Sequence, residues 1–459
     1  MFQELRRPRA FYARLFRLTG PIALQNLITF SLGLIDTFMV SRLGNTPMAA
    51  VTTANVPVFL LISLVFGIQS GLGILASQYW GKGDTESISR AIGVASFIGT
   101  GLSLLLAVAL WLWPVAIMDL LSNEHELSVL GAPYLQIIGF SYVFNMLSSI
   151  YVSVQRSVEN PNFGMKLFGF STVLNTGLNY LLIYGKLGFP QLGVQGAAIA
   201  TVLSRYVELG IIVIYTHSHA KKHPFARGLF RTLSIPRQVV KEITIKGMPL
   251  LVNELLWSLG MATLNQIYSL RGLDVVAATS ISTTVFNLFS VFFFSMGTAA
   301  SIIVGQDLGA DEVEVAKDHA WKLIAFSVAI SVVVGLTLIS CSHAIPLLYD
   351  VLPSVRSLAS QLILVCACMM PANAFCNCEY FIIRSGGKTG ITFLFDCGFT
   401  WVLCIPLAYC LTHFTAMSVV LIFLCERFLD VIKGVIGLVL VKKGVWIHNI
   451  VSGKEMQVN

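Results

Sequence analysis

Apolar stretches of about 20 residues recur along nearly the whole chain, and this repetition limits the fold more than any other feature of the sequence. A helix rises about 1.5 Å per residue, so each stretch is long enough to cross a hydrocarbon layer roughly 30 Å thick. Of the 459 residues, 56% are hydrophobic and 12% are charged, whereas about a quarter are charged in an ordinary soluble domain. We therefore expect an all-α integral membrane protein.

The stretches predict twelve transmembrane helices, because a helix satisfies its own backbone polar groups inside a bilayer. Their expected bounds are 15–39, 47–72, 91–113, 131–153, 165–187, 193–216, 243–268, 276–300, 317–340, 355–382, 390–411 and 414–441.

The basic residues predict the orientation, since Lys and Arg are retained on the cytoplasmic side of a membrane. One alternate set of segments between the spans holds 23 Lys and Arg residues, and the other set holds Arg42, Lys186, Arg271 and Arg356. Both termini are therefore expected in the cytoplasm, with the protein in the cell's inner (plasma) membrane. The net charge of +7 follows from the same bias, so it gives no reason to expect a nucleic-acid partner.

An internal repeat organises the chain. Residues 228 positions apart match without a gap, and the matched pairs include Pro21 with Pro249, Gly44 with Gly272, Gln78 with Gln306 and Gly81 with Gly309. An even number of spans in each half gives both copies the same topology. We predict two six-helix lobes related by pseudo-twofold symmetry about the membrane normal. The N-lobe is expected at 1–216, a cytoplasmic linker at 217–242 and the C-lobe at 243–459.

Ionisable residues inside spans are candidate functional sites, because a charge in hydrocarbon costs at least a few kcal/mol. Asp36 and Glu254 stand out, since neither has a basic residue at helical spacing and neither has an acidic counterpart in the repeat. Either could take up a proton or bind a cation. The competing interpretation is a carboxyl group that only hydrogen-bonds to a neighbouring helix.

Other ionisable residues have simpler explanations. Arg205 with Glu208, and Asp430 with Lys433, have i, i+3 spacing and are expected to neutralise each other. We expect the Asp396 side chain to cap a helix start or to contact water. Glu379 is ambiguous: it lies near the cytoplasmic end of its span, where the simpler explanation is a side chain that extends to the cytoplasmic surface.

All nine cysteines lie between Cys341 and Cys425, mostly within predicted spans. We interpret them as small core residues, not as disulfides or metal ligands.

Several segments resemble the multidrug and toxic compound extrusion (MATE) family, in its order and along essentially the whole chain. The clearest are LTGPIALQNLITFSLGLIDTFMVSRLG (18–44), LGVQGAAIAT (192–201), IIVGQDLGA (302–310) and FIIRSGGKTG (381–390). The resemblance implies a secondary active transporter, not an enzyme, that exports lipophilic cationic drugs or other xenobiotics. Transport would be antiport with H⁺ or Na⁺ by alternating access, with no cofactor other than the coupling ion.

The resemblance also implies the site residues. Asp36 matches the acid of the family's coupling-ion site, and Asn175, Asn179 and Thr201 match its partners, so these four would hold H⁺ or Na⁺. Glu254 matches an acid of the C-lobe, where it would serve a coupling ion or substrate. Asn373 falls where related members carry an Asp.

Two alternative functions remain. A flippase for lipid-linked oligosaccharide would favour a cationic cavity, and the spans hold few basic residues. An ion channel or a sensory membrane protein is the alternative from another class. The expected partners are small drugs or metabolites and membrane lipids, and the expected state is a monomer.

Overall fold

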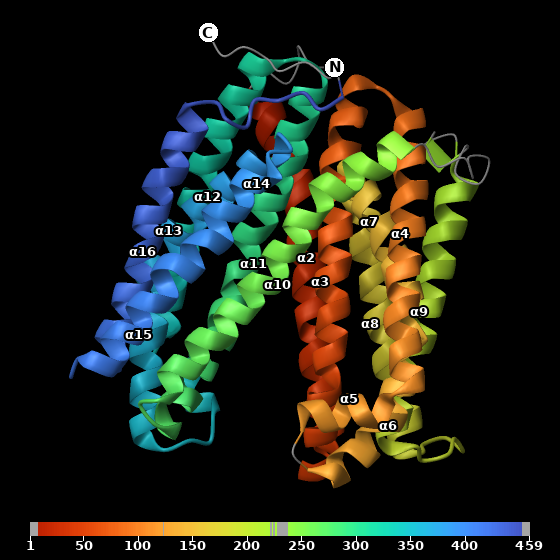
Figure 1. Cartoon of the computed structure of the whole chain (residues 1–459), viewed down its shortest axis with the longest axis vertical. Helices are drawn as coiled ribbons and strands as arrows, with labels where there is room; N and C mark the ends of the chain where they lie inside the picture. The colour runs from red at the N-terminus through yellow and green to blue at the C-terminus, as the bar shows by residue number, and fades with distance from the viewer. Residues whose placement is uncertain (1–7, 123, 221–222, 224, 227–236, 452–459) are drawn as a thin grey trace. The chain divides into compact units, whose positions relative to one another are not determined.

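The computed structural model describes residues 8–122, 124–220, 223, 225–226 and 237–451. Nearly all of these residues are helical, and none forms a β-strand (Figure 1). Every predicted span coincides with a helix or with a run of consecutive helical segments. The predicted fold class is therefore confirmed. The predicted linker, 217–242, lies largely outside the described residues.

The chain divides into two compact units. The N-unit holds Leu24–Trp80 and Asp84–Leu251, and the C-unit holds Met1–Ala23, Gly81–Gly83 and Val252–Asn459. The boundaries inside the first and seventh spans follow Ala23 and Leu251, which are 228 positions apart. Each boundary lies two residues after a proline inside a helix, Pro21 or Pro249. A proline removes a helical hydrogen bond and weakens the helix locally.

The N-unit contains the first group of spanning helices. Short polar connections end them: Asp84 caps α4 by accepting a hydrogen bond from the backbone nitrogen of Ser87 at 3.0 Å, and Gly185 closes α8 with a φ of 65°. The elements are α2 (Pro8–Ser41, from Leu24 onward), α3 (Asn45–Lys82), α4 (Thr85–Leu112), α5 (Pro114–Leu121), α6 (His125–Gly139), α7 (Ser141–Ser157), α8 (Pro161–Tyr184) and α9 (Gly193–Ser218).

The C-unit contains the second group, and one of its spans departs from α-helical geometry. Two π-helical segments, η3 (Leu394–Gly398) and η4 (Thr400–Cys404), interrupt the predicted eleventh span. The other elements are α10 (Arg237–Ser269, from Val252 onward), α11 (Leu273–Gly309), α12 (Val313–Cys341), η2 (Ile345–Leu348), α13 (Pro353–Ser385), α14 (Thr389–Phe393), α15 (Ile405–Phe414) and α16 (Val419–Lys442).

Length and composition mark most of these helices as membrane spans. Among the described residues, eight helical stretches are long and apolar enough to cross a bilayer, and α6 with α7, bent by 43°, makes a ninth. The other three predicted spans are α8, α10 and α16. Of these three, α16 carries four charged residues close together within its apolar run: Glu426, Arg427, Asp430 and Lys433.

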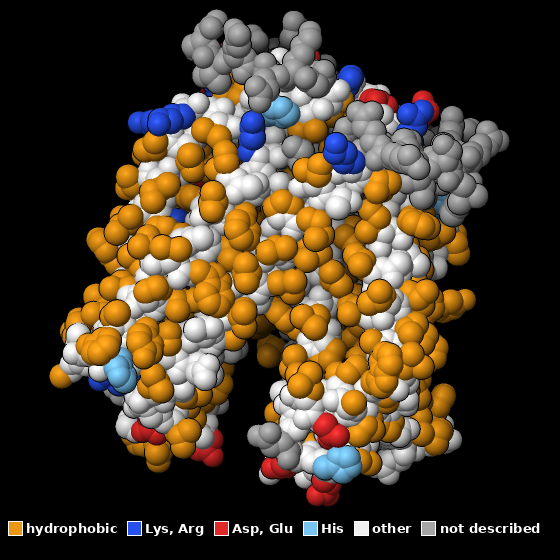
Figure 2. Space-filling view, in the orientation of Figure 1, with side chains coloured by type: hydrophobic (Ala, Val, Ile, Leu, Met, Phe, Trp, Pro, Cys, Tyr) orange, Lys and Arg blue, Asp and Glu red, His pale blue; other side chains and the backbone are white. Residues whose placement is uncertain are grey.

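Hydrophobic side chains cover the middle of the visible face of each unit, and most visible Lys and Arg side chains lie toward one end (Figure 2). In the N-unit, Leu105 is 67% exposed and Val173 is 73% exposed. Large apolar groups at such exposure are typical of a surface that meets lipid.

Candidate functional site

Four predicted site residues of the N-unit form one hydrogen-bonded chain, here called the N-cluster: Asp36, Asn175, Asn179 and Thr201. The Nδ2 atom of Asn179 lies 2.7 Å from a carboxylate oxygen of Asp36 and 3.0 Å from Oδ1 of Asn175. Asn175 Nδ2 then lies 3.4 Å from the Thr201 hydroxyl oxygen. The structure thus brings together all four residues that the sequence assigned to one site.

Three helices supply the N-cluster. Asp36 comes from α2 and Thr201 from α9, while Asn175 and Asn179 are one turn apart on α8 and share a face. Both asparagines are buried, whereas Asp36 and Thr201 are partly exposed. An acid is therefore reachable at the edge of a buried amide pair.

One atom of the N-cluster has an unfilled hydrogen-bonding capacity. Oδ1 of Asn179 is buried and accepts no hydrogen bond from the described residues. Leaving a buried acceptor without a partner costs about 1–3 kcal/mol. A bound cation, or a proton carried on Asp36, would supply that partner. The carboxylate, amide and hydroxyl oxygens of the cluster are of the kind that bind hard cations such as Na⁺.

The predicted pair of Arg205 and Glu208 is confirmed. A guanidinium nitrogen of Arg205 lies 2.7 Å from a carboxylate oxygen of Glu208, and the Ser148 hydroxyl donates to the other oxygen. The Glu208 charge is therefore balanced within the N-unit.

The C-unit does not join its two predicted site residues. Glu254 is partly buried on α10, and no hydrogen bond or ion pair connects it with Asn373 in the described part of the chain. Asn373 instead donates a hydrogen bond of 3.2 Å to Asp430. A C-lobe role for Glu254 and Asn373 stays a prediction.

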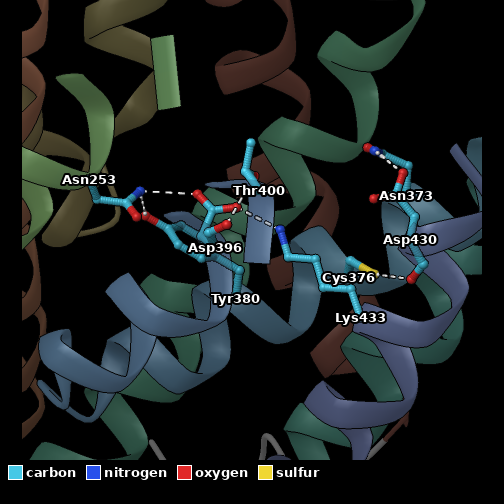
Figure 3. Close-up of polar contacts among 8 residues, drawn as sticks. All are labelled: Asn253, Asn373, Cys376, Tyr380, Asp396, Thr400, Asp430 and Lys433. Atoms are coloured by element: carbon cyan, nitrogen blue, oxygen red, sulfur yellow. Dashed lines mark hydrogen bonds and ion pairs between the residues drawn. The ribbon is translucent and has the colours of Figure 1, made fainter. Parts of the chain in front are cut away.

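A second polar group, which the sequence did not predict, lies in the C-unit (Figure 3). One carboxylate oxygen of Asp396 lies 2.6 Å from the Lys433 ammonium, and the other accepts from Asn253 at 3.0 Å. Asn253 also contacts the Tyr380 hydroxyl at 3.4 Å. We call Asn253, Tyr380, Asp396 and Lys433 the C-cluster.

Three sequence expectations are corrected here. Lys433 pairs with Asp396 on another element, not with Asp430 on its own helix. Asp396 lies inside the π-helical segment η3 and forms this ion pair, so it is not a helix cap. Glu379 is fully buried, so it does not reach the cytoplasmic surface. The repeat gave one signal for the C-cluster, because Lys433 falls 228 positions after Arg205.

Five of the nine cysteines are buried as expected of core residues, whereas Cys341 and Cys425 are partly exposed and Cys368 and Cys410 are exposed. All nine are free, and the described residues contain no group of three His, Cys, Asp or Glu side chains arranged to hold a metal.

A family model, MatE, matches the chain at residues 21–181 and again at residues 249–410. The chain belongs to the MATE family. The two matches begin 228 positions apart, in agreement with the internal repeat. Members of the MATE family are multi-pass membrane transporters, so this MATE chain is a transporter and not an enzyme.

Known MATE proteins resemble the chain over most of its length. The probable multidrug resistance protein YoeA of Bacillus subtilis is 26% identical over 87% of this chain and 86% of its own. The multidrug resistance protein MdtK of Pectobacterium atrosepticum is 26% identical over 87% of both chains. A mutant of the Vibrio cholerae MATE transporter VcmN aligns with a TM-score of 0.87 and 19% identity, covering 94% of this chain and 96% of that one. The structural likeness supports the twelve-helix, two-lobe MATE fold.

Proposed function

We propose that this MATE protein exports lipophilic cationic drugs or other xenobiotics by antiport with H⁺ or Na⁺ through alternating access. The names of the relatives YoeA and MdtK, both described as multidrug resistance proteins, support the class of cargo. Parallel repeats of six spans support alternating access by motion of one lobe against the other.

The observation that carries the coupling proposal is the hydrogen bond from Asn179 to Asp36, together with the Asn179 side-chain oxygen that accepts no hydrogen bond from the described residues. In this proposal the coupling ion binds at Asp36, with Asn175, Asn179 and Thr201 completing its surroundings. A proton would sit on the carboxyl group, and Na⁺ would take oxygen ligands from the same four side chains. No other cofactor enters the proposal.

The proposal includes the location and the orientation of the protein in the membrane. We place the protein in the plasma membrane as a monomer, with both termini in the cytoplasm and residues 217–242 linking the lobes there. The excess of Lys and Arg in one alternate set of segments supports this orientation. Its partners are then the exported small molecules and the surrounding lipids.

The proposal is tested in proteoliposomes that contain the full-length protein and ethidium. A proton gradient and a sodium gradient are imposed separately, and the initial rate of ethidium movement is recorded for each. The proposal expects transport under one gradient and a rate near that of protein-free vesicles without any gradient. Equal rates with and without both gradients would contradict antiport.

A further inference from the structure

A groove on the C-unit lies outside both polar clusters. Most of its lining comes from residues between Leu394 and Leu403, in and between η3 and η4, and the remaining lining residue is Ile436 of α16. All of the lining residues are apolar, and the volume of the groove is about 320 Å³. Leu394 and Val402 are 67% and 70% exposed. The groove therefore belongs to an apolar surface within a membrane span, where the surrounding medium is lipid.

Two local features leave this space open. The segments η3 and η4 are π-helical, and a π-turn joins residues five positions apart, so the side chains do not line up as they would on an α-helix. Gly398, the last residue of η3, has no side chain. A Cβ added there would meet only Leu394, at ordinary contact distances of 3.7 Å and 3.9 Å. A larger side chain at position 398 would therefore fit and would take up part of the groove.

Contacts between η3 and α16 fix how the two segments lie along each other. Lys433 contacts Asp396 at 2.6 Å, and a Cβ added at Gly437 would lie 3.0 Å from the Phe395 ring. Residue numbers rise along α16 as they fall along η3, so the two segments are antiparallel. The start of α14 and the end of α16 therefore lie toward the same end of the C-unit.

That end is basic. Lys443 follows Ile436 by seven positions, which places it on the same face of α16, two turns or about 10 Å beyond the groove. Lys442 and Lys443 are exposed, and neither has an ion-pair partner among the described residues. Lys388, at the start of α14, precedes Phe395 by the same seven positions. An apolar groove thus leads toward a positively charged membrane surface.

We propose that the groove and Lys443 form a binding site for an anionic phospholipid, with one acyl chain in the groove and the phosphate group at Lys443. The arrangement matches the two parts of such a lipid in chemistry and in order along the membrane normal. Anionic lipids attract basic side chains at the cytoplasmic surface, where the charge distribution places Lys443. Because Phe395 lines the groove and precedes Asp396, the lipid would pack against the segment that carries the C-cluster.

Other occupants match the groove less well. A helix from another protein is about 10 Å across and is too wide for a groove of this volume. An organic cation would find no acid in the lining, since Asp396 is not part of it and is paired with Lys433. The inference rests on the membrane-spanning fold, and it does not depend on the cargo or the coupling ion of transport.

The test is native mass spectrometry of the full-length protein released from detergent micelles. The protein is titrated with palmitoyl-oleoyl phosphatidylglycerol, or with phosphatidylethanolamine that carries the same chains. One lysine near the membrane surface is worth about a factor of five in binding an anionic lipid. The first phosphatidylglycerol should therefore bind at least about fivefold more tightly than the first phosphatidylethanolamine.

The charge is tested with Lys443→Gln. This variant should bind phosphatidylglycerol about fivefold more weakly and phosphatidylethanolamine as the wild type does. Lys166→Gln is the matched control, because Lys166 is an exposed lysine of α8 in the N-unit. It should leave the affinity of the first phosphatidylglycerol unchanged.

The groove is tested with Gly398→Leu. Each buried methylene of an acyl chain is worth about a factor of four, so excluding even two of them weakens binding of both lipids by about tenfold or more. Gly101→Leu on α4 is the control, because nothing lies within 4 Å of its added Cβ. In the Gly398→Leu background, Lys443→Gln should have almost no further effect, since a displaced lipid no longer holds its phosphate there.

Equal binding of the two lipids by the wild type would overturn the proposal. So would an unchanged affinity in Gly398→Leu, or independent effects of Gly398→Leu and Lys443→Gln in the double variant. Competition between ethidium and the first phosphatidylglycerol would assign the groove to cargo and would also overturn the proposal. If Gly398→Leu does not fold, Leu403→Trp fills the groove from its exposed side and is read in the same way.

Discussion

The side-chain amide nitrogen of Asn179 lies 2.7 Å from a carboxylate oxygen of Asp36 and also reaches Asn175. One donor group thus fixes the acid of α2 against the polar face of α8. Because that donor is buried, its contact with Asp36 is protected from competing water. The strength of this contact sets the expected cost of removing it.

Asn179→Leu should reduce the initial rate of ethidium efflux from cells by about tenfold or more. A hydrogen bond to a charged group is worth about 1.5–3 kcal/mol, and tenfold corresponds to about 1.4 kcal/mol. Thr37→Val is a matched control, since among the described residues its exposed hydroxyl bonds only to the Gly33 carbonyl of its own helix. Equal efflux by both variants at equal expression would remove Asn179 from the site.

Glu254→Gln should slow efflux, but less severely than loss of the Asp36 charge. Glu254 is partly buried and lies beside Asn253 of the C-cluster in sequence, yet it forms no bond with Asn373 among the described residues. The measurement is the initial efflux rate at matched expression. A wild-type rate would assign Glu254 a structural role.

Gly437→Ala should destabilise the packing of α13 against α16. The added methyl group would collide with Glu379 and approach Phe395, and overpacking of a filled core costs typically about 1–3 kcal/mol. The measurement is the thermal unfolding midpoint of the purified protein in detergent. Gly210→Ala is the control, because nothing lies within 4 Å of its added Cβ. Equal midpoints for the two variants would show that the space beside Gly437 is not filled.

Asp307→Asn should destabilise the C-unit strongly. Asp307 is fully buried, lies 2.7 Å from His319 and 3.8 Å from Arg14, and breaking a buried ion pair costs about 3–5 kcal/mol. Asp318→Asn removes an exposed acid paired with Lys322, where a cost of about 0–1 kcal/mol is expected. Unfolding midpoints measured in detergent separate the two cases. If Asp307→Asn lowered the unfolding midpoint no more than Asp318→Asn does, the buried pair would contribute little to stability.

The fold could be predicted because two features of the sequence extend along the whole chain: the repeated apolar runs and the internal repeat. Apolar runs fix the number of spans, and a constant offset of 228 fixes their arrangement into halves. The boundary within α2 was not predictable, since the repeat does not reveal that Pro8–Ala23 packs with the C-unit. There Phe11 stacks on His319 from far along the chain.

The N-cluster was predictable because regular α-helices keep residues at i and i+4 on one face, as for Asn175 and Asn179. The C-cluster was not, because Asp396 lies in a π-helical segment. Helical periodicity also made Asp430 the natural partner of Lys433, but the lysine side chain reaches an acid 37 positions away in sequence. Tertiary contacts of long side chains cannot be derived from spacing on one helix.

The most direct test of the central claim compares wild-type and Asp36→Asn protein in proteoliposomes at equal density, with proton and sodium gradients imposed together. The account predicts gradient-driven ethidium transport by the wild type and none above protein-free vesicles for Asp36→Asn, although the variant inserts normally into the membrane. Gradient-driven transport by Asp36→Asn at the wild-type rate would contradict coupling through the N-cluster.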